Sequence, residues 1–288
     1  MILRYQAASE YINVEELSSS ASLQIKRFKD SVYWGEVVEG KREGLGVMLY
    51  LNGRVYEGGW EGNYRHKKGY EKFSNGSIYK GEYVQGKPEG CGRYEWENGE
   101  LYEGEWKAGL KHGSGIWRGS KGDSYIGEWQ EGKAEGYGVH TWTNGDRYEG
   151  EFKECLKHGE GVERFANGDS YKGNYEGGKP HGYGEYFWAS GSFFKGNFKV
   201  GLRCGQGVWK RGPGLSDKYE GEWFNDKKEG YGVFTWADGS VYKGNFVNDL
   251  KDGYGEVEYN DGRIYKGQWK GDQQLEPTQD EMQHDEDC

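Results

Sequence analysis

Apolar and polar residues alternate in short runs that recur along the chain. Residues 219–223 read Tyr, Glu, Gly, Glu, Trp, and many other segments follow the same order. Strict alternation predicts a β-strand with one apolar face. Tyr219, Gly221 and Trp223 should therefore share one face, while Glu220 and Glu222 lie on the other.

A second run, residues 230–236, follows the first and also alternates. Here Gly230 and Gly232 fall on the same face as Phe234 and Trp236. Glycine is unfavourable inside a strand unless another group approaches the backbone closely. We therefore expect an aromatic ring from a neighbouring strand to lie over these glycines.

The two runs repeat together, and each repeat opens with an aromatic residue two positions before a glycine. The interval between these anchors is 23 residues, except for one interval of 25 residues with the extra pair near Pro213. A fixed period of this length predicts a repeat architecture built by stacking hairpins. The eleven anchors are Tyr33, Tyr56, Tyr79, Tyr102, Tyr125, Tyr148, Tyr171, Phe194, Tyr219, Tyr242 and Tyr265.

Turn signals separate the runs. Dipeptides such as Asn98-Gly99 and Asp238-Gly239 tolerate the positive φ that hairpin turns require. A Gly-x-Gly pair precedes the next anchor in almost every repeat, but the second repeat has Lys67 in place of the first glycine. The pattern predicts an all-β protein: an elongated, single-layer antiparallel sheet of about eleven hairpins.

Composition supports a thin, ordered sheet. Only 34% of the residues are hydrophobic and the mean hydropathy is -1.05, which is too polar for a thick core. Aromatic residues nevertheless make up 16% of the chain, far more than disordered chains contain. The 52 glycines lack a three-residue period, which excludes collagen.

Charge and cysteine content narrow the class of protein. The net charge is -10, and the acidic excess is concentrated after residue 270, which argues against a nucleic-acid groove. The four cysteines show neither disulfide nor metal-ligand spacing, so we interpret them as reduced and the protein as cytosolic. The first residues lack a basic region followed by an apolar core, and no apolar stretch is long enough for a membrane helix, so we expect neither export nor membrane spanning.

These motifs resemble the MORN (membrane occupation and recognition nexus) repeat over about residues 33 to 270. Residues 102–106 and 148–152 match its opening half, and residues 136–139 and 230–233 match its second half. MORN arrays occur in radial spoke heads, cytoskeletal scaffolds and membrane tethers, and also appended to lipid kinases or methyltransferases. The resemblance implies a non-catalytic scaffold in the cytoplasm or cytoskeleton, most directly in the radial spoke head of a ciliary or flagellar axoneme. A membrane- or phosphoinositide-associated tether and a regulatory adaptor for an enzyme are the alternatives.

We expect other protein subunits as partners, with no cofactor, no metal and no nucleic acid; anionic lipid and a second copy of the chain are kept as options. The predicted contact surface is an aromatic groove with one edge of the hairpin loops. One loop position holds lysine and leucine in alternate repeats from the third repeat onward. Each leucine therefore recurs after two repeats, which places the leucines roughly 19 Å apart. They either pack on the next loop or form a docking stripe. The predicted contact residues are Tyr102, Trp106, Tyr125, Trp129, Tyr148, Phe152, Trp223 and Trp236 in the groove and Leu110, Leu156, Leu202 and Leu250 on the edge.

Other polar motifs are assigned to the repeat background. His66, His112, His158 and His181 occupy one repeat position and are interpreted as loop residues, because a long row cannot converge on one metal ion. The paired glutamates of each opening strand are interpreted as a solvated outer face. The basic segment 65–68 is either solvated or a contact for anionic lipid. We find no Ser, His and Asp set and no P-loop, so the protein is predicted not to be an enzyme.

The ends of the chain differ from the repeats and give three predicted regions. Residues 1–30 form a cap segment, in which 2–17 have a helical period and 22–28 read as a strand that covers the first sheet edge. The helix either caps the sheet or binds a partner. Residues 31–270 form the repeat array, and residues 271–288, with seven acidic and no basic groups, are predicted to be disordered.

Overall fold

The computed structural model describes residues 12 and 14–275, with side chains from Leu17 onward in the short helix. The predicted helix before residue 12 lies outside this range, and so does most of the segment 271–288 that was predicted to be disordered. The prediction was wrong for residues 271–275, which are described and include a short strand at Gln273–Gln274 that pairs with the last long strand. The chain divides into two compact units, residues 1–143 with 153–155 and residues 144–152 with 156–288. Each unit is described by itself.

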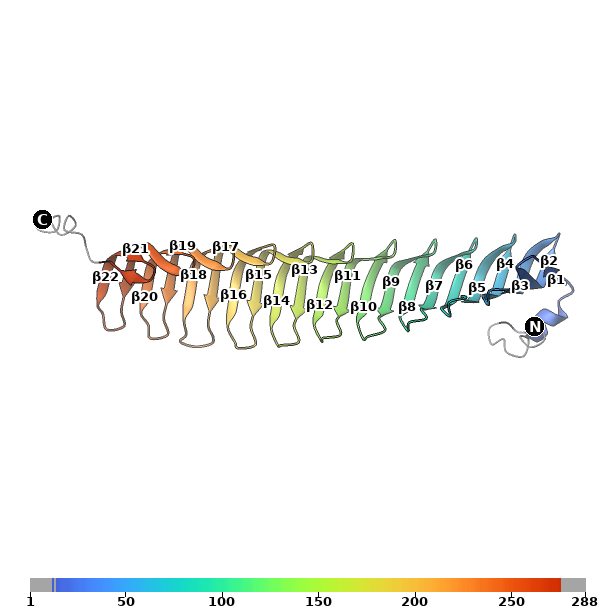
Figure 1. The fold of residues 1–288 in the computed structure, drawn as a ribbon, viewed down its shortest axis with the longest axis horizontal. Coiled ribbons are helices and arrows are strands. Elements are labelled where there is room, and N and C mark those ends of the chain that lie inside the picture. The colour runs from blue at the N-terminus through green and yellow to red at the C-terminus, as the bar shows by residue number, and fades with distance from the viewer. Residues whose placement is uncertain (1–11, 13, 276–288) are drawn as a thin grey trace, which may run out of the picture. The chain divides into compact units, whose positions relative to one another are not determined.

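The described part of the first unit begins with helix α2 (Val14–Ser19), which is followed by strands that pair antiparallel with their neighbours in chain order (Figure 1). Its strands are β1 (Leu23–Arg27), β2 (Ser31–Val38), β3 (Lys41–Tyr50), β4 (Val55–Glu61), β5 (Tyr64–Lys72), β6 (Ile78–Val84), β7 (Lys87–Glu95), β8 (Leu101–Lys107), β9 (Leu110–Arg118), β10 (Ser124–Gln130) and β11 (Lys133–Thr141).

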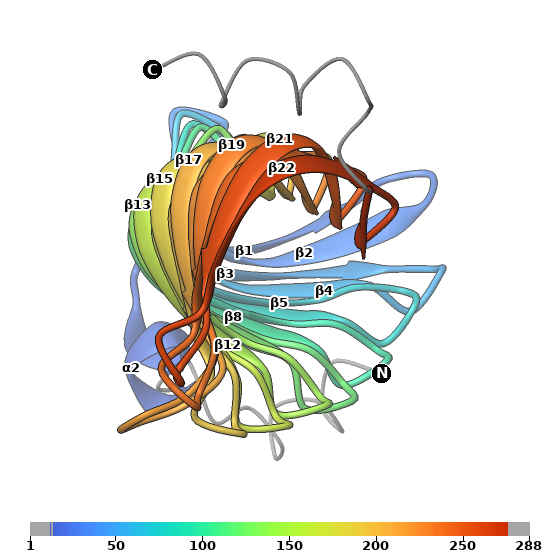
Figure 2. The ribbon, with the colours of Figure 1, turned by 90° about the vertical axis from the view of Figure 1, so that its left-hand side faces the viewer.

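The second unit continues the same hairpins, and Figure 2 shows that its later strands are strongly bent. Its strands are β12 (Arg147–Lys153), β13 (Leu156–Arg164), β14 (Ser170–Glu176), β15 (Lys179–Phe187), β16 (Phe193–Lys199), β17 (Leu202–Lys210), β18 (Lys218–Phe224), β19 (Lys227–Thr235), β20 (Val241–Val247), β21 (Leu250–Glu258), β22 (Ile264–Lys270) and β23 (Gln273–Gln274). The predicted all-β class and the antiparallel hairpin repeat are confirmed. The eleventh anchor strand, β22, pairs with β21 on one side, and on its other side it pairs with only the two residues of β23.

Glycines form a line across the sheet of each unit. Gly104 of β8 lies opposite Gly92 of β7 and Gly115 of β9, and the same register recurs in the second unit, where Gly221 lies opposite Gly207 and Gly232. The anchor ring of the same repeat covers this line. A Cβ placed on Gly115 would lie 2.4 Å from the Tyr102 hydroxyl oxygen. The prediction that a ring covers bare backbone is therefore confirmed.

The first glycine of each Gly-x-Gly pair has a different role from the second. Gly113 and Gly136 have φ of 55° and 66° and lie where the second strand has two more residues than its partner, so they form β-bulges. The sequence analysis treated both glycines as packing residues, and for the first one the backbone conformation is the stronger requirement.

Two kinds of turn join the strands. The turn between β8 and β9 has positive φ at both central residues, 51° at Ala108 and 87° at Gly109, as a type I′ turn requires. In the turn between β7 and β8, positive φ occurs at Gly99 (85°), while the Asn98 side chain accepts a hydrogen bond from the Glu100 amide. The asparagine therefore stabilises this turn through its side chain.

The N-terminal segment caps the first hairpins. Strand β1 pairs with β2 and covers that sheet edge, as predicted. Ile12 and Leu17 are buried in a cluster with Trp34, Val47 and Leu49 on the face opposite the anchor rings. The segment therefore covers the outer face as well as the edge, and the capping interpretation holds for the part of the helix that is described.

Candidate binding surface on the aromatic face

The anchor rings define one side of the sheet, called here the aromatic face, and most of the predicted contact residues are buried in it. Tyr102 and Tyr148 are 0% exposed, and Trp106 is 8% exposed. Trp236 is the one predicted groove residue that is only half-buried. The remaining members of the set are also buried: Tyr125, Trp129, Phe152 and Trp223.

These rings pack against one another as a ladder of edge-to-face contacts. Tyr102 contacts Trp106 of its own strand at 5.1 Å and Trp129 of the next repeat at 5.3 Å, with ring planes at 88° and 84°. Edge-to-face geometry is favourable for aromatic pairs. The tyrosine hydroxyl donates to the Glu105 carbonyl at 2.9 Å, and the Trp106 Nε1 donates to the Gly92 carbonyl at 3.1 Å. The ladder is thus a core with satisfied polar atoms.

Basic side chains cover the ladder on the side of the type I′ turns. The Lys111 ammonium lies 3.9 Å from the Trp129 ring centre, and the Arg203 guanidinium lies 4.2 Å from that of Trp223. Such cation–π contacts stabilise by about 0.5–1 kcal/mol each when exposed. The sequence analysis assigned no role to these basic residues. Their recurrence one residue after the leucine was the available signal.

A second row of aromatic residues lies near the opposite turns and remains accessible. The side chains are half-buried and come in pairs two residues apart on one strand, such as Tyr94 with Trp96 at 4.6 Å and Phe234 with Trp236 at 4.9 Å. Sequence analysis found only Trp236 of this row. The signal it missed is a tryptophan in every second repeat, in register with the lysine and leucine alternation: Trp96, Trp142, Trp188 and Trp236.

The edge leucines are partly exposed. Leu110 in the first unit is 50% exposed, and Leu156, Leu202 and Leu250 in the second are 52%, 42% and 46% exposed. Contact with a neighbouring loop also occurs, because the Leu156 Cδ2 lies 3.8 Å from the Cβ position of Gly178. The position of Leu156 agrees with packing on the next loop, and the exposure of all four leucines leaves about half of each side chain available to a partner.

Two buried carboxylates interrupt the ladder, and sequence analysis missed both. Glu71 is 1% exposed and accepts a hydrogen bond of 2.8 Å from the Tyr83 hydroxyl, with Arg54 and Arg65 as ion-pair partners. In the second unit, Glu163 is 6% exposed and pairs with the Tyr175 hydroxyl at 2.9 Å and with Lys157.

A coincidence in the sequence identifies these two sites. From the second repeat onward, the position of Tyr83 and Tyr175 holds Trp or Phe in all the other repeats. A glutamate lies twelve residues before this position only where the residue is tyrosine. A buried tyrosine hydroxyl needs an acceptor, whereas phenylalanine does not. The glutamate supplies that acceptor.

The motifs set aside in the sequence analysis lie mostly on strands. His66 and His112 are within β5 and β9, so the interpretation as loop residues was wrong; the type I′ turn ends two residues earlier. The His66 Nε2 lies 2.9 Å from a Glu61 carboxylate oxygen. The second glutamate of the opening strand is not merely solvated, because Glu105 accepts a hydrogen bond of 2.9 Å from the Ser114 amide in the bulge.

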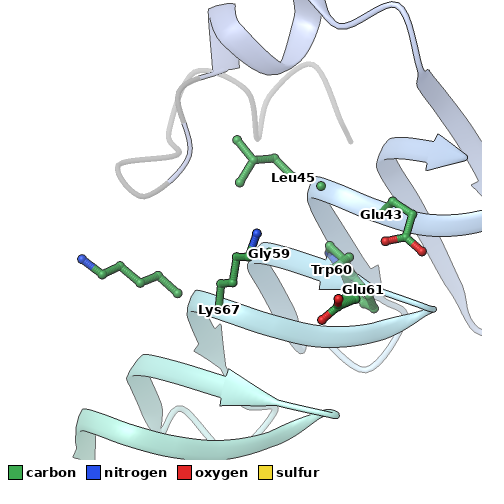
Figure 3. Close-up of a pocket in the computed structure, with 8 residues that line it drawn as sticks. Glu43, Leu45, Gly59, Trp60, Glu61 and Lys67 are labelled. Atoms are coloured by element: carbon green, nitrogen blue, oxygen red, sulfur yellow. The ribbon is translucent and has the colours of Figure 1, made fainter.

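A shallow depression on the outer face marks the irregular second repeat (Figure 3). Gly59 stands where the other repeats have Glu, Asn or Gln, and Lys67 stands where they have the first glycine. A Cβ on Gly59 would lie 3.3 Å from the Lys67 Cβ and 2.3 Å from the His66 carbonyl oxygen. Each substitution makes room for the other. Lys67 keeps the positive φ of the glycine it replaces, 58°.

This exchange predicts a compensating pair of mutations. Gly59→Glu should lower the free energy of unfolding by about 2 kcal/mol, because the new side chain overlaps the bulge. Adding Lys67→Gly should restore stability to at least the original value, since a non-glycine residue at positive φ costs about 1–2 kcal/mol. Urea unfolding of both single variants and the double variant tests the coupling. Additive effects would show that the two positions are independent.

The basic segment 65–68 is divided between the two faces. Arg65 is held on the aromatic face by Glu71, whereas Lys67 and Lys68 line the outer depression beside Glu43 and Glu61. The four cationic or titratable side chains therefore do not form one patch.

The buried tyrosines predict loss of stability in alkali. Burial raises the pKa of Tyr242 to about 12 and raises the pKa of Tyr102 and Tyr219 further. Below pH 10 the folded and unfolded chains both keep these protons, so the stabilisation is complete. Above pH 10 the unfolded chain loses protons that the folded chain retains, which favours unfolding by at most about 1.4 kcal/mol per pH unit for each tyrosine.

The urea midpoint should therefore fall steeply between pH 10 and pH 11 and stay level between pH 8 and pH 9. Tyr242→Phe should make the alkaline decline shallower, since Phe194 already occupies an anchor position. A midpoint that is independent of pH up to 11 would contradict the prediction.

Metal and membrane sites were sought in the described residues. Over residues 12 and 14–275, no three His, Cys, Asp or Glu side chains come together as a metal ion would need. In the same part of the chain, no helix has the length and apolar character of a membrane span.

Comparison with solved structures gives 62 matching chains, and those described below are only weakly similar to this chain. No curated protein matches the chain. The SAS-4 (dCPAP) TCP domain of Drosophila melanogaster, solved with a proline-rich motif of Ana2 (dSTIL), is 13% identical, with 59% of this chain and 88% of that chain covered and a TM-score of 0.33. The TCP10 domain of Danio rerio CPAP is also 13% identical, with 79% and 95% covered and a TM-score of 0.24. Scores this low support no conclusion about this chain.

The repeat itself gives a clear assignment. A profile of the MORN repeat matches ten segments, and the anchor Tyr265 lies beyond the last of them. The segments are 33–53, 56–78, 79–100, 102–124, 125–147, 148–170, 171–193, 194–216, 219–241 and 242–262. Together they cover well over half of the sequence, and they begin at ten of the eleven anchors. The chain therefore belongs to the MORN-repeat family.

Proposed function

We propose that this chain is a non-catalytic scaffold that binds segments of other protein subunits along its aromatic face and its leucine edge. MORN repeats suggest a repeat scaffold or a protein-binding role, and proteins built from them are generally non-catalytic. The observation that carries the proposal is the row of half-buried aromatic pairs, because accessible aromatic side chains are enriched at protein interfaces.

The buried and accessible aromatic residues have separate roles in this proposal. The ladder that includes Tyr102, Trp106, Tyr125, Trp129, Tyr148, Phe152 and Trp223 keeps the sheet rigid. Direct contact with a partner is assigned to Trp236 and its counterparts in alternate repeats, together with the exposed halves of Leu110, Leu156, Leu202 and Leu250. Rigid aromatic side chains gain contact area at a small cost in conformational entropy.

Alanine at Trp188 and Trp236 tests this assignment within the second unit. Proximity labelling in cells should lose its strongest protein partners in the double variant. Tyr231→Ala is the matched control, because Tyr231 is 55% exposed on the outer face of the same unit. Equal loss in the control, or retention of all partners in the double variant, would reject the aromatic row as the contact surface.

For the assembly, we propose the axoneme, with the radial spoke head as the first choice. This step rests on the family resemblance, since MORN arrays occur there. The test is fractionation of a ciliated cell that expresses the tagged chain. Retention on the detergent-stripped axoneme, with cross-links to spoke-head subunits, supports the proposal. Release with the membrane fraction would instead favour a lipid tether, and co-purification with a kinase or methyltransferase would favour a regulatory adaptor.

A further inference from the structure

Two neighbouring lysines on the aromatic face of the second unit are held in aromatic cages. The Lys228 ammonium lies 4.9 Å from the ring centre of Phe234 and 5.3 Å from that of Phe246. The Lys251 ammonium lies 4.3 Å from Trp269 and 5.3 Å from Trp236. Each cation therefore sits among rings of both the ladder and the accessible row.

These two cations make few close ion pairs. Within residues 12 and 14–275, Lys228 has no carboxylate oxygen within 4.0 Å, and Lys251 has one, Asp272 Oδ1 at 3.9 Å. Burial lowers the pKa of both ammonium groups by more than the nearby carboxylates of Asp249 and Asp272 raise it, and the charge of Lys228 also lowers the pKa of Lys251. Because charged groups shielded from water are costly unless paired, an additional anion should bind favourably here.

The chain leads from this site toward the C-terminal acidic segment. Asp272, the partner of Lys251, follows β22 directly. The Gln274 side chain donates to the Tyr259 hydroxyl at 2.7 Å, and the Tyr265 hydroxyl donates to the Leu275 carbonyl at 2.8 Å. Tyr259 and Tyr265 both belong to the aromatic face, since Tyr265 is an anchor and Tyr259 is the counterpart of Trp236. The described chain therefore ends beside this face.

Residues 276–288 have the charge and length that the site requires. They contain six acidic residues and no lysine or arginine. At about 3.3 Å per residue, thirteen extended residues can span roughly 43 Å, whereas two repeats occupy roughly 19 Å of the sheet. Both lysines are therefore within reach of the acidic side chains.

We propose that the acidic segment 276–288 binds across the aromatic face of the second unit, with its carboxylates on Lys228 and Lys251. The occupant is this chain's own segment, and the attachment through residues 272–275 raises its effective concentration above that of a free peptide. The inference stands apart from the proposed scaffold function, because it needs no other subunit.

Zero-length carbodiimide cross-linking of the full chain tests the proposal. It joins a carboxylate to an amine only when the two are in contact. Mass spectrometry should find residues 276–287 joined to Lys228 or Lys251 at least fivefold more often than to Lys243, which is exposed on the outer face of the neighbouring strand. Mixing isotopically labelled and unlabelled chains distinguishes a segment bound to its own chain from one bound to a second copy.

A second variant keeps the outcome interpretable. Replacing the six acidic residues with Asn or Gln leaves the described residues unchanged and should raise the acetylation rate of Lys228 severalfold while leaving that of Lys243 constant. Cross-links spread over Lys228, Lys251 and Lys243 alike would overturn the proposal. So would cross-links between labelled and unlabelled chains in the proportion expected from random pairing, or an acetylation rate of Lys228 that does not respond.

Discussion

We expect Glu71→Ala to lower the free energy of unfolding by about 3 kcal/mol. Removing one member of a buried ionic network leaves the others unpaired and costs about 3–5 kcal/mol. The lower value applies because the side chains of Arg54 and Arg65 are 30% and 21% exposed and can regain water. Tyr83 is 1% exposed, so its hydroxyl cannot regain water as a partner. Urea unfolding measures the loss, and a change below 1 kcal/mol would contradict it.

A double variant tests the reason for that loss. Glu71→Tyr with Tyr83→Trp copies the pair found in the following repeat, where Tyr94 lies 6.2 Å from Trp106. Arg65 would then lie over a tryptophan, as Arg42 lies 4.3 Å from Trp60. We expect most of the lost stability to return, because no buried hydroxyl or carboxylate remains without a partner. A double variant as unstable as Glu71→Ala would show that the unpaired groups are not the cause.

Alanine at Gly232 should cost about 3 kcal/mol, although it adds a single methyl group. The new Cβ would lie 2.5 Å from the Tyr219 ring. That ring cannot withdraw easily, because its hydroxyl donates to the Glu222 carbonyl at 2.9 Å and its edge-to-face contact with Trp223 is 5.2 Å long. Overpacking of this kind typically costs 1–3 kcal/mol, and the locked ring places Gly232 at the upper end.

Two further glycines separate overlap from backbone strain. Gly212 has no atom within 4 Å of its Cβ position and no positive φ, so Gly212→Ala should be nearly neutral. Gly239 is equally open but has φ of 95°, so Gly239→Ala should cost about 1 kcal/mol through conformation alone. Urea unfolding should show the largest loss of stability for Gly232→Ala, a smaller loss for Gly239→Ala and almost none for Gly212→Ala. Equal values for Gly232→Ala and Gly239→Ala would remove the packing role of the second glycine.

The period and the alternation predicted the hairpins, the faces and the ring over glycine, because each depends on residues near one another in sequence. Turn geometry was predictable only in part. Ala108 and Val200 adopt positive φ of 51° and 54° without the glycine or asparagine that would signal it. The type I′ turn imposes this conformation on them, and the only local signal is the glycine that follows each of them, Gly109 and Gly201.

The candidate surface was harder to predict, because alternation gives the face of a side chain but not its exposure. Tyr148 and Trp236 share a face, yet Tyr148 is covered by the rings of its neighbours and Trp236 is not. Glu71 illustrates the same limit. Its burial depends on Arg54, Arg65 and Tyr83, which come from three different strands or turns. The contacts of these groups are set by the bending of the strands, which a two-residue period does not encode.

The glycine line also bears on how such an array tolerates insertions. The loop at Arg211–Ser216 contains two extra residues, yet Gly207 still lies opposite Gly221 and Gly221 opposite Gly232. Since only glycine fits beneath an anchor ring, each strand pair finds its own alignment, whatever precedes it. A longer loop therefore changes the structure only locally. The next strand restores the register, so the following strands keep their alignment. Whole hairpins could be gained or lost during evolution on the same terms.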